Sequence, residues 1–248
     1  MNIGIYLIFL YLGVLLSGIA YSKITTKRNQ WTAWLSIFGG AFLFAICFIH
    51  LLPEVYRWGN EHDGASESVK IAGVAVLFGF VLQLLLENLG GGHEQAHFRS
   101  AETSAIGKKS ALLFLIGLCI HAFLEGMALI HDNHVETGMF YGVLVHNIPL
   151  SMVLMMHFLE AGYKNKEALW MLSIFGIAGP LGALFGNSLT VLQPYYHLIL
   201  AVVIGILLHV ASAILYFPKT DKGERYSFFL AIISAFVLVL LIPEHVHS

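Results

Sequence analysis

Long apolar segments with almost no charged residues constrain the fold of this chain more than any other feature. Of its 248 residues, 58% are hydrophobic and 11% are charged, whereas about a quarter of a soluble domain is charged. A helix of about 20 apolar residues spans the ~30 Å hydrocarbon core of a bilayer, so each segment predicts a transmembrane helix. Eight segments qualify: 3–22, 33–52, 70–88, 110–131, 137–159, 168–188, 197–216 and 226–243.

The charges of the loops predict how these helices are oriented. When the loops are assigned alternately to the two sides of the membrane, eleven of the thirteen Lys and Arg residues fall on one side. Positively charged loops stay in the cytoplasm. We therefore predict an all-α polytopic membrane protein with eight transmembrane helices, both termini outside and a cytoplasmic loop at 89–109. Residues 1–248 should form one domain in a plasma or bacterial inner membrane, and a net charge of −2 offers no basic surface to nucleic acid.

A carboxylate and two histidines are expected near the middle of the fourth and fifth spans. Glu125 follows His121 by four residues, so both side chains project from one face of the fourth helix. His146 lies at a similar depth in the fifth helix and is followed by Asn147 and by Pro149, which cannot donate a helical hydrogen bond. Ionisable groups at this depth cost about 3 kcal/mol each to insert, so they are candidates for function.

Two imidazoles and one carboxylate form a donor set that suits Zn²⁺ or Fe²⁺ and leaves coordination positions open. We therefore predict that His121, Glu125 and His146 form a primary metal site, with Asn147 as a candidate additional ligand. The alternative is that Glu125 is a buried, protonated hydrogen-bond partner of the two histidines.

Other polar residues extend this site toward both faces of the membrane. His50 and Glu54 stand four residues apart around Pro53, which we expect to end the second helix, and they form a candidate entrance on the outer side. His157 comes eleven residues after His146, about three helical turns, so it lies on nearly the same face and is a candidate exit toward the cytoplasm.

An H-E-x-x-H motif occurs at residues 93–97. In zinc proteases this motif lies on a helix that presents both histidines, and a third ligand completes the site. Here three glycines precede the motif in a polar cytoplasmic loop. We therefore interpret His93 and His97 as a loose cytosolic metal-binding segment rather than a catalytic centre.

Four of these motifs together resemble the ZIP (Zrt/Irt-like) metal transporters over essentially the whole chain. Residues 50–54 (HLLPE) are similar to the ending of the second span in that family, and residues 121–126 (HAFLEG) to its fourth-span motif. Residues 146–149 (HNIP) resemble the fifth-span motif, and residues 179–183 (GPLGA) the sixth-span motif. The resemblance implies uptake of a metal ion toward the cytosol by an elevator-like movement, in which helices one, four, five and six carry the metal.

The chain departs from this pattern where many family members hold a second metal ion. Ala122, Asn147, Leu150 and Gly179 stand at the corresponding places. The resemblance therefore implies the branch of the family that has only the primary position.

From these observations we predict a secondary carrier of a divalent ion, with Zn²⁺ as substrate and Fe²⁺, Mn²⁺ or Cd²⁺ as further candidates. The sequence has no glycine-rich phosphate loop of an ATPase. The alternative is a membrane-embedded zinc-dependent hydrolase, but we find no second carboxylate at mid-membrane to act as its general base. The partners expected are the metal ion and the lipid bilayer, and the resemblance adds a candidate homodimer.

Overall fold

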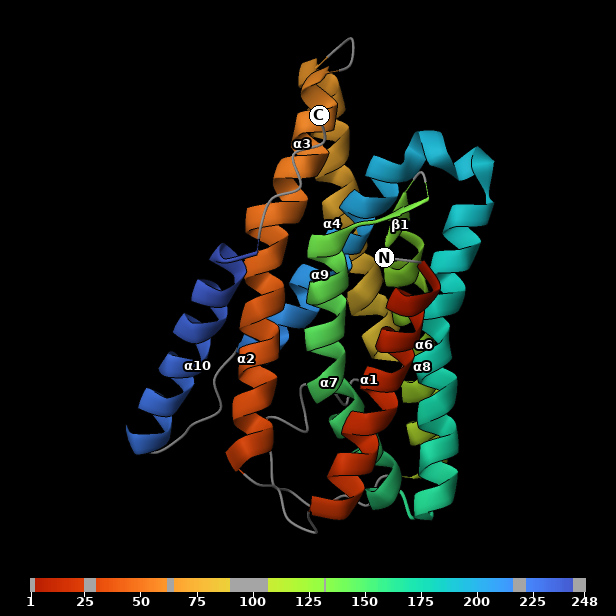
Figure 1. The fold of residues 1–248 in the computed structure, drawn as a ribbon, viewed down its shortest axis with the longest axis vertical. Coiled ribbons are helices and arrows are strands. Elements are labelled where there is room, and N and C mark those ends of the chain that lie inside the picture. Colours follow the sequence, from red (N-terminus) through yellow and green to blue (C-terminus); the bar gives the residue numbers. More distant parts are fainter. Residues whose placement is uncertain are drawn as a thin grey trace.

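The computed structural model describes residues 3–24, 30–61, 65–89, 107–131, 133–215 and 222–242, which are almost entirely helical (Figure 1). A π-helical turn spans Cys47–Leu51, and a 3₁₀ helix spans Thr190–Tyr195. Two short strands, β1 (Ile130–His131) and β2 (His134–Val135), pair in antiparallel fashion. The helices are α1 (Ile3–Ile24), α2 (Gln30–Ile46), α3 (Leu52–Glu61), α4 (Ala65–Leu89), α6 (Lys108–Met127), α7 (Thr137–Glu160), α8 (Asn165–Ser188), α9 (Tyr196–Leu215) and α10 (Lys222–Leu240).

The helices have the length and composition of a membrane protein. In the described part of the chain, five helical segments are long and apolar enough to cross a bilayer, and three shorter ones are apolar. Each of the eight predicted spans overlaps one of these segments. The prediction of an all-helical polytopic membrane protein is therefore confirmed, whereas the side on which the termini lie stays a prediction.

Large apolar side chains cover the outside of the bundle. On α4, Val74 is 64% exposed and Leu77 is 67% exposed, and α1 and α10 carry similar residues on their outer faces. Soluble proteins rarely expose so continuous an apolar surface. Lipid tails are its natural environment, because they are as apolar as the side chains that face them.

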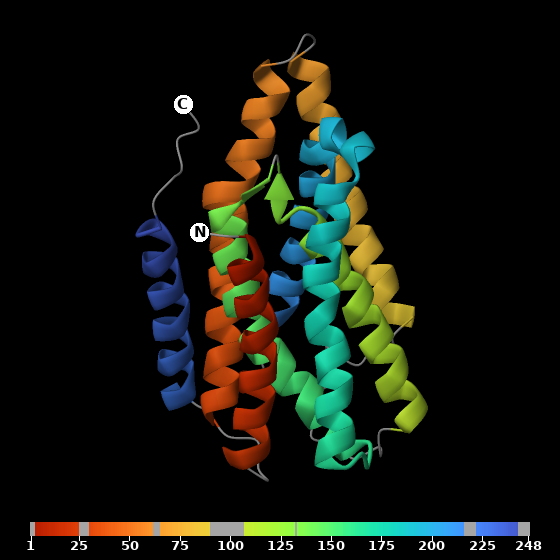
Figure 2. The same ribbon diagram turned by 45° about the vertical axis from the view of Figure 1, so that its right-hand side comes forward.

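Two pairs of helices pack more extensively than any others, α4 with α9 and α6 with α8 (Figure 2). In the first pair, a Cβ atom on Gly205 would overlap the backbone carbonyl of Val76. In the second, a Cβ atom on Gly182 would overlap the backbone carbonyl of Phe123. Glycine allows the helix backbones to come this close. Within a bilayer no hydrophobic effect drives helices together, so van der Waals contact at such close approaches stabilises the pair.

The second helix does not end at Pro53, contrary to the sequence prediction. The helix continues through Pro53 as far as Glu61, and the segment immediately before it takes the π-helical form. There the N–H of Leu52 donates to the carbonyl of Cys47, five residues back. This shift changes the hydrogen-bonding register just where proline lacks an N–H, so the chain passes the proline without breaking the helix.

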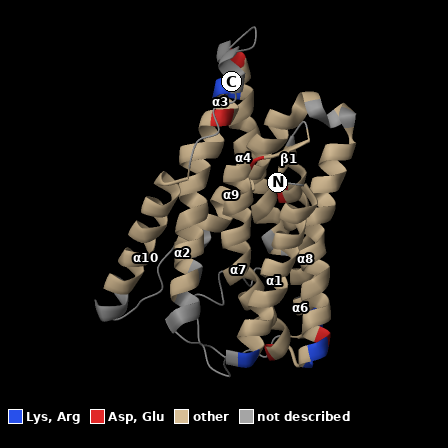
Figure 3. Ribbon diagram, viewed as in Figure 1, with Lys and Arg blue, Asp and Glu red and all other residues tan. Residues whose placement is uncertain are grey.

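Apart from the buried Glu125, most of the described charged residues lie toward the two ends of the bundle (Figure 3). Lys23 lies in the last turn of α1, Lys108 and Lys109 begin α6, and Lys164 and Lys166 flank the start of α8. These ends of the three helices lie at the bottom of Figure 1. Arg57 and its ion-pair partner Glu54 lie at the opposite end. This separation agrees with the alternating loop assignment made from the sequence.

The close contact between α4 and α9 should make Gly205 intolerant of even one methyl group. We expect Gly205→Ala to lower the free energy of unfolding by about 1–3 kcal/mol, the usual cost of overpacking a tight contact. Gly73→Ala on α4 is the matched control, because a Cβ atom there meets nothing within 4 Å. It should leave stability unchanged or raise it slightly through helix propensity. Thermal unfolding in detergent measures both variants, and equal melting temperatures would contradict the packing argument.

Candidate metal centre

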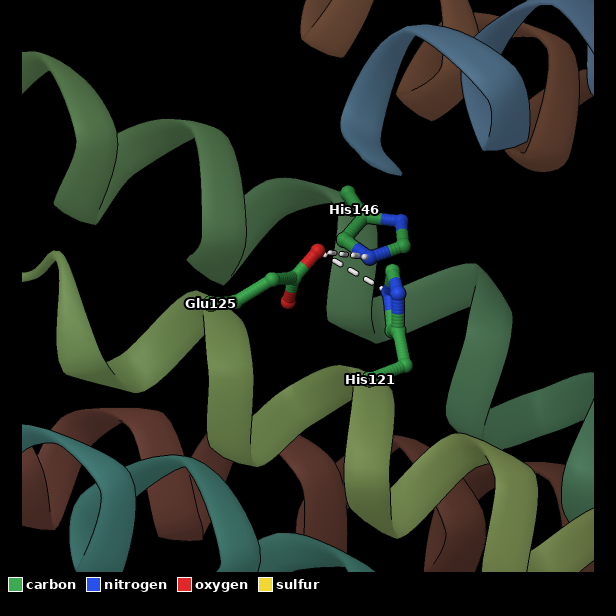
Figure 4. Close-up of side chains that lie close together, drawn as sticks. All are labelled: His121, Glu125 and His146. Carbon is green, nitrogen blue, oxygen red and sulfur yellow. Dashed lines mark ion pairs between the residues drawn. The ribbon is translucent and has the colours of Figure 1, made fainter. Parts of the chain in front are cut away.

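Three ionisable side chains converge in the interior of the bundle (Figure 4). His121 and Glu125 project from the same face of α6, as their spacing predicts, and His146 reaches them from α7. All three are buried, with exposed fractions of 1%, 0% and 0%. Within the described residues, they are the one group of three His, Cys, Asp or Glu side chains whose ligand atoms lie close enough together to hold a metal ion.

The distances within this group suit a single small cation. Nε2 of His121 lies 2.9 Å from Oε1 of Glu125, and Nε2 of His146 lies 3.6 Å from the same oxygen. Two ligand atoms bound to a tetrahedral Zn²⁺ at about 2.0–2.1 Å are about 3.3 Å apart, between these two values. All three ligand atoms lie within 4.8 Å of one another, so a small adjustment of the side chains would bring them around one ion.

Protein partners satisfy only part of the hydrogen-bonding capacity of these three side chains. The described ion pairs of Glu125 are with His121 and His146, and both pairs use the same carboxylate oxygen, Oε1. Among the described residues, no hydrogen-bond partner reaches Oε2 of Glu125 or Nδ1 of His146. Buried polar atoms are nearly always hydrogen-bonded, so this group has the unmet capacity that a bound cation with its water ligands would fill.

Asn147 lies beside this group. It is buried, its Oδ1 has no hydrogen-bond partner among the described residues, and it lines a small cavity together with Glu125. Residues of α1, α6, α7 and α8 form the walls of the cavity, and Gly179 is among them. The cavity therefore lies next to the carboxylate, on the face of α6 that packs against α8.

The other residues predicted from the sequence lie apart from the three converging side chains. His157 is buried near the end of α7, with its ring centroid 4.9 Å from that of Phe114. Glu54 pairs with Arg57 at 3.3 Å, and Nε2 of His50 lies 3.4 Å from the backbone carbonyl of Val239. His93 and His97 lie outside the described residues.

Two polar residues near the group were not identified from the sequence. Gln83 on α4 is 3% exposed, and its Oε1 lies 3.3 Å from Nδ1 of His121. His209 on α9 is also buried and makes an edge-on contact with the ring of Phe80 at 4.9 Å. Each lies inside a predicted span, 70–88 or 197–216, with apolar residues directly before and after it, and that setting is the signal in the sequence that points to them.

Comparison with known proteins shows which family this chain matches. The family described as "ZIP Zinc transporter" matches residues 88–242. The chain is 26% identical over 137 residues to "Zinc transporter ZIP9" of Micropogonias undulatus, a region that covers 53% of this chain and 44% of that protein. It is 28% identical over 147 residues to "Zinc transporter ZIP9-B" of Xenopus laevis, covering 53% of this chain and 48% of that protein. The matched regions thus span about half the length of these curated relatives.

Proposed function

This chain belongs to the ZIP zinc transporter family, and on that premise we propose that it carries Zn²⁺ across a membrane through His121, Glu125 and His146. The observation that supports this proposal is the convergence of these three buried donors from α6 and α7. The curated relatives that it resembles are named zinc transporters, which favours Zn²⁺ as the substrate.

The donor set fits a transported ion rather than a permanently held one. Three protein ligands leave at least one coordination position of Zn²⁺ open to water, as in sites where ligands exchange. Imidazole donors favour Zn²⁺ and Fe²⁺ over Mg²⁺ and Ca²⁺, which prefer oxygen ligands only. We propose Zn²⁺ as the main substrate, with Fe²⁺, Mn²⁺ and Cd²⁺ as competing ions and Asn147 as an additional ligand.

The proposed path runs between the two ends of the bundle. His50 and Glu54 lie toward the end that carries Arg57, and we propose that they form the entrance. His157 lies near the end of α7, toward the lysine-rich end, and we propose it as a stage on the exit route. Since positively charged loops face the cytoplasm, this direction corresponds to uptake into the cytosol, with both termini outside.

Further features of the proposal concern the whole molecule. We propose that residues 1–248 act as one transport domain in a plasma or bacterial inner membrane, with a homodimer as the candidate assembly. We also propose that α1, α6, α7 and α8 move against the other helices. The close packing of α6 against α8 supports this grouping, because such a pair would move as one body.

The alternative, a membrane-embedded zinc hydrolase, is less well supported. Such an enzyme uses a metal-bound water as nucleophile and needs a further group to accept its proton. In the described part of the chain, Glu125 is the one buried carboxylate, and a metal would engage it as a ligand. The family match is to transporters, which favours a carrier.

Transport should depend on the charge of Glu125. We expect Glu125→Gln to reduce ⁶⁵Zn²⁺ flux into proteoliposomes at least tenfold, because the amide keeps the shape of the side chain but removes the one anionic ligand. Glu167→Gln is the matched control, since Glu167 is exposed at the start of α8 and accepts a hydrogen bond from the backbone of Lys164. It should transport at the wild-type rate. Full flux through Glu125→Gln would show that this carboxylate is not part of the transport site.

The site should hold one ion rather than two. Gly179 lines the cavity beside Glu125 and has no side-chain donor. Leu150, at another place where the family resemblance would put a ligand, is apolar, so a second ion bridged by this carboxylate would lack ligands. Anomalous scattering from crystals soaked in Cd²⁺ should show a single strong peak beside His121 and His146. Two strong peaks separated by about 3.5–4 Å, the spacing of two-metal sites, would contradict this prediction.

The histidines of the H-E-x-x-H motif should be dispensable for transport. They belong to a polar segment of the sequence that follows three glycines. We expect the double variant His93→Ala/His97→Ala to keep ⁶⁵Zn²⁺ flux within about threefold of wild type at equal protein level. A loss of flux comparable to that of Glu125→Gln would instead assign these histidines to the transport path.

A further inference from the structure

Gln83 makes a side-chain contact with the proposed transport site from outside the helices that carry the site. It lies on α4, in an otherwise apolar stretch, and is 3% exposed. Its Oε1 is 3.3 Å from Nδ1 of His121. The inference drawn from this contact rests on the proposed function, because it concerns how His121 binds the metal.

The chemistry of the contact fixes the protonation of the His121 ring. A carbonyl oxygen can only accept a hydrogen bond, so Nδ1 must carry the proton that it donates to Gln83. In the neutral ring, the lone pair then belongs to Nε2. Nε2 lies 2.9 Å from Oε1 of Glu125, so without a metal ion a proton lies between these two atoms. A metal ion that binds both residues would displace this proton and take the Nε2 lone pair. Metal-binding histidines commonly have their other nitrogen held in this way.

The hydrogen bond also connects two different parts of the bundle. His121 lies on α6, which packs closely along α8, whereas Gln83 lies on α4, which packs closely along α9. α4 and α6 contact each other far less extensively than either contacts its own partner. The ring of His121 thus has a hydrogen-bond partner from a helix pair other than its own.

We propose that Gln83 is a positioning residue that orients His121 for metal binding and ties the affinity of the site to the placement of α6 against α4. A displacement of α6 by one helical turn, about 5.4 Å, would break a contact of 3.3 Å. His121 would then lose its fixed tautomer, and the site would bind its ion less tightly. Loss of such an outer partner typically costs 10–100-fold in metal affinity. The ion is therefore held firmly in the arrangement described here and released more easily once α6 moves.

The first test removes the acceptor and then restores it. We expect Gln83→Met, which is apolar and of similar length, to raise the Kd for Zn²⁺ about 10–100-fold, measured by calorimetry in detergent. Gln83→Glu keeps an acceptor oxygen and should bind within about threefold of wild type. Ser234→Ala on α10 is the control, since that hydroxyl donates to the backbone of its own helix, and it should not change the Kd. An unchanged Kd for Gln83→Met would overturn the proposal.

A spectroscopic readout separates positioning from a merely structural role. The ¹⁵N chemical shifts of the His121 ring should report a proton on Nδ1 in the metal-free wild type and a mixture of tautomers in Gln83→Met. A wild-type ring without a proton on Nδ1 would overturn the proposal even if Gln83→Met failed to fold. Glu125→Gln in the same Zn²⁺-binding assay separates a failure of the proposed transport site from a failure of the role proposed for Gln83. If it binds Zn²⁺ normally, the proposed function fails; if only Gln83→Met binds normally, only the role of Gln83 fails.

A cross-linking experiment tests whether transport requires α6 to move relative to α4. Gly117 on α6 lies against the backbone of Leu86 on α4, with 3.5 Å between an added Cβ atom and the Leu86 carbonyl oxygen. A Leu86→Cys/Gly117→Cys pair, made without Cys47 and Cys119 and joined by a short thiol cross-linker, would hold α6 in this position. We expect the cross-linked protein to bind Zn²⁺ with the Kd of its uncross-linked form but to lose ⁶⁵Zn²⁺ flux. Unimpaired flux through the cross-linked protein would show that α6 need not leave α4.

Discussion

The absence of water in the hydrocarbon core is the constraint on which the rest of this structure depends. Every backbone N–H and C=O within the membrane must be hydrogen-bonded inside the protein, and helices meet this demand within a single segment. The same demand explains the π-helical turn before Pro53, which carries the second helix past a residue without an N–H. The lack of water also makes it costly to bury a polar side chain in the interior. Buried polar residues such as Glu125 and Gln83 are therefore candidates for a functional role rather than for packing alone.

Packing in this environment depends on how closely helices can approach rather than on the exclusion of water. Gly182 and Gly205 allow α6 to lie on α8 and α4 to lie on α9 at distances that no other residue would permit. The proposed site lies on the α6 side of the boundary between these two pairs, while Gln83 reaches it from the α4 side. A carrier must both hold and release its ion. In the proposed mechanism, movement of α6 along α4 would break the hydrogen bond from His121 to Gln83 and so weaken the binding of the ion by His121.

The sequence predicted much of this because two of its signals are local. The length of an apolar segment reports a membrane span, and the four-residue spacing of His121 and Glu125 reports a shared helical face whatever surrounds the helix. The interpretation of Pro53 failed because a proline removes one hydrogen bond without dictating how the helix responds. His50 and Glu54 were assigned from their four-residue spacing at the outer end of one helix, and His157 from its eleven-residue spacing from His146. Spacing within one helix did not reveal that Glu54 pairs with Arg57 or that His157 packs against Phe114.

By itself, then, the sequence determined the all-helical membrane fold, the resemblance to the family and the pairing of His121 with Glu125. Each of these is carried within single segments, by apolar length, by a short motif or by four-residue spacing. Only the tertiary structure decided that His146 closes on the same carboxylate oxygen and that Asn147 lies beside a small cavity. It alone selected Gln83 from the polar residues of the chain as the partner of His121. The physical reason is that contacts between helices depend on their rotation and crossing, which glycine contacts and side-chain packing fix collectively. No single segment carries that information.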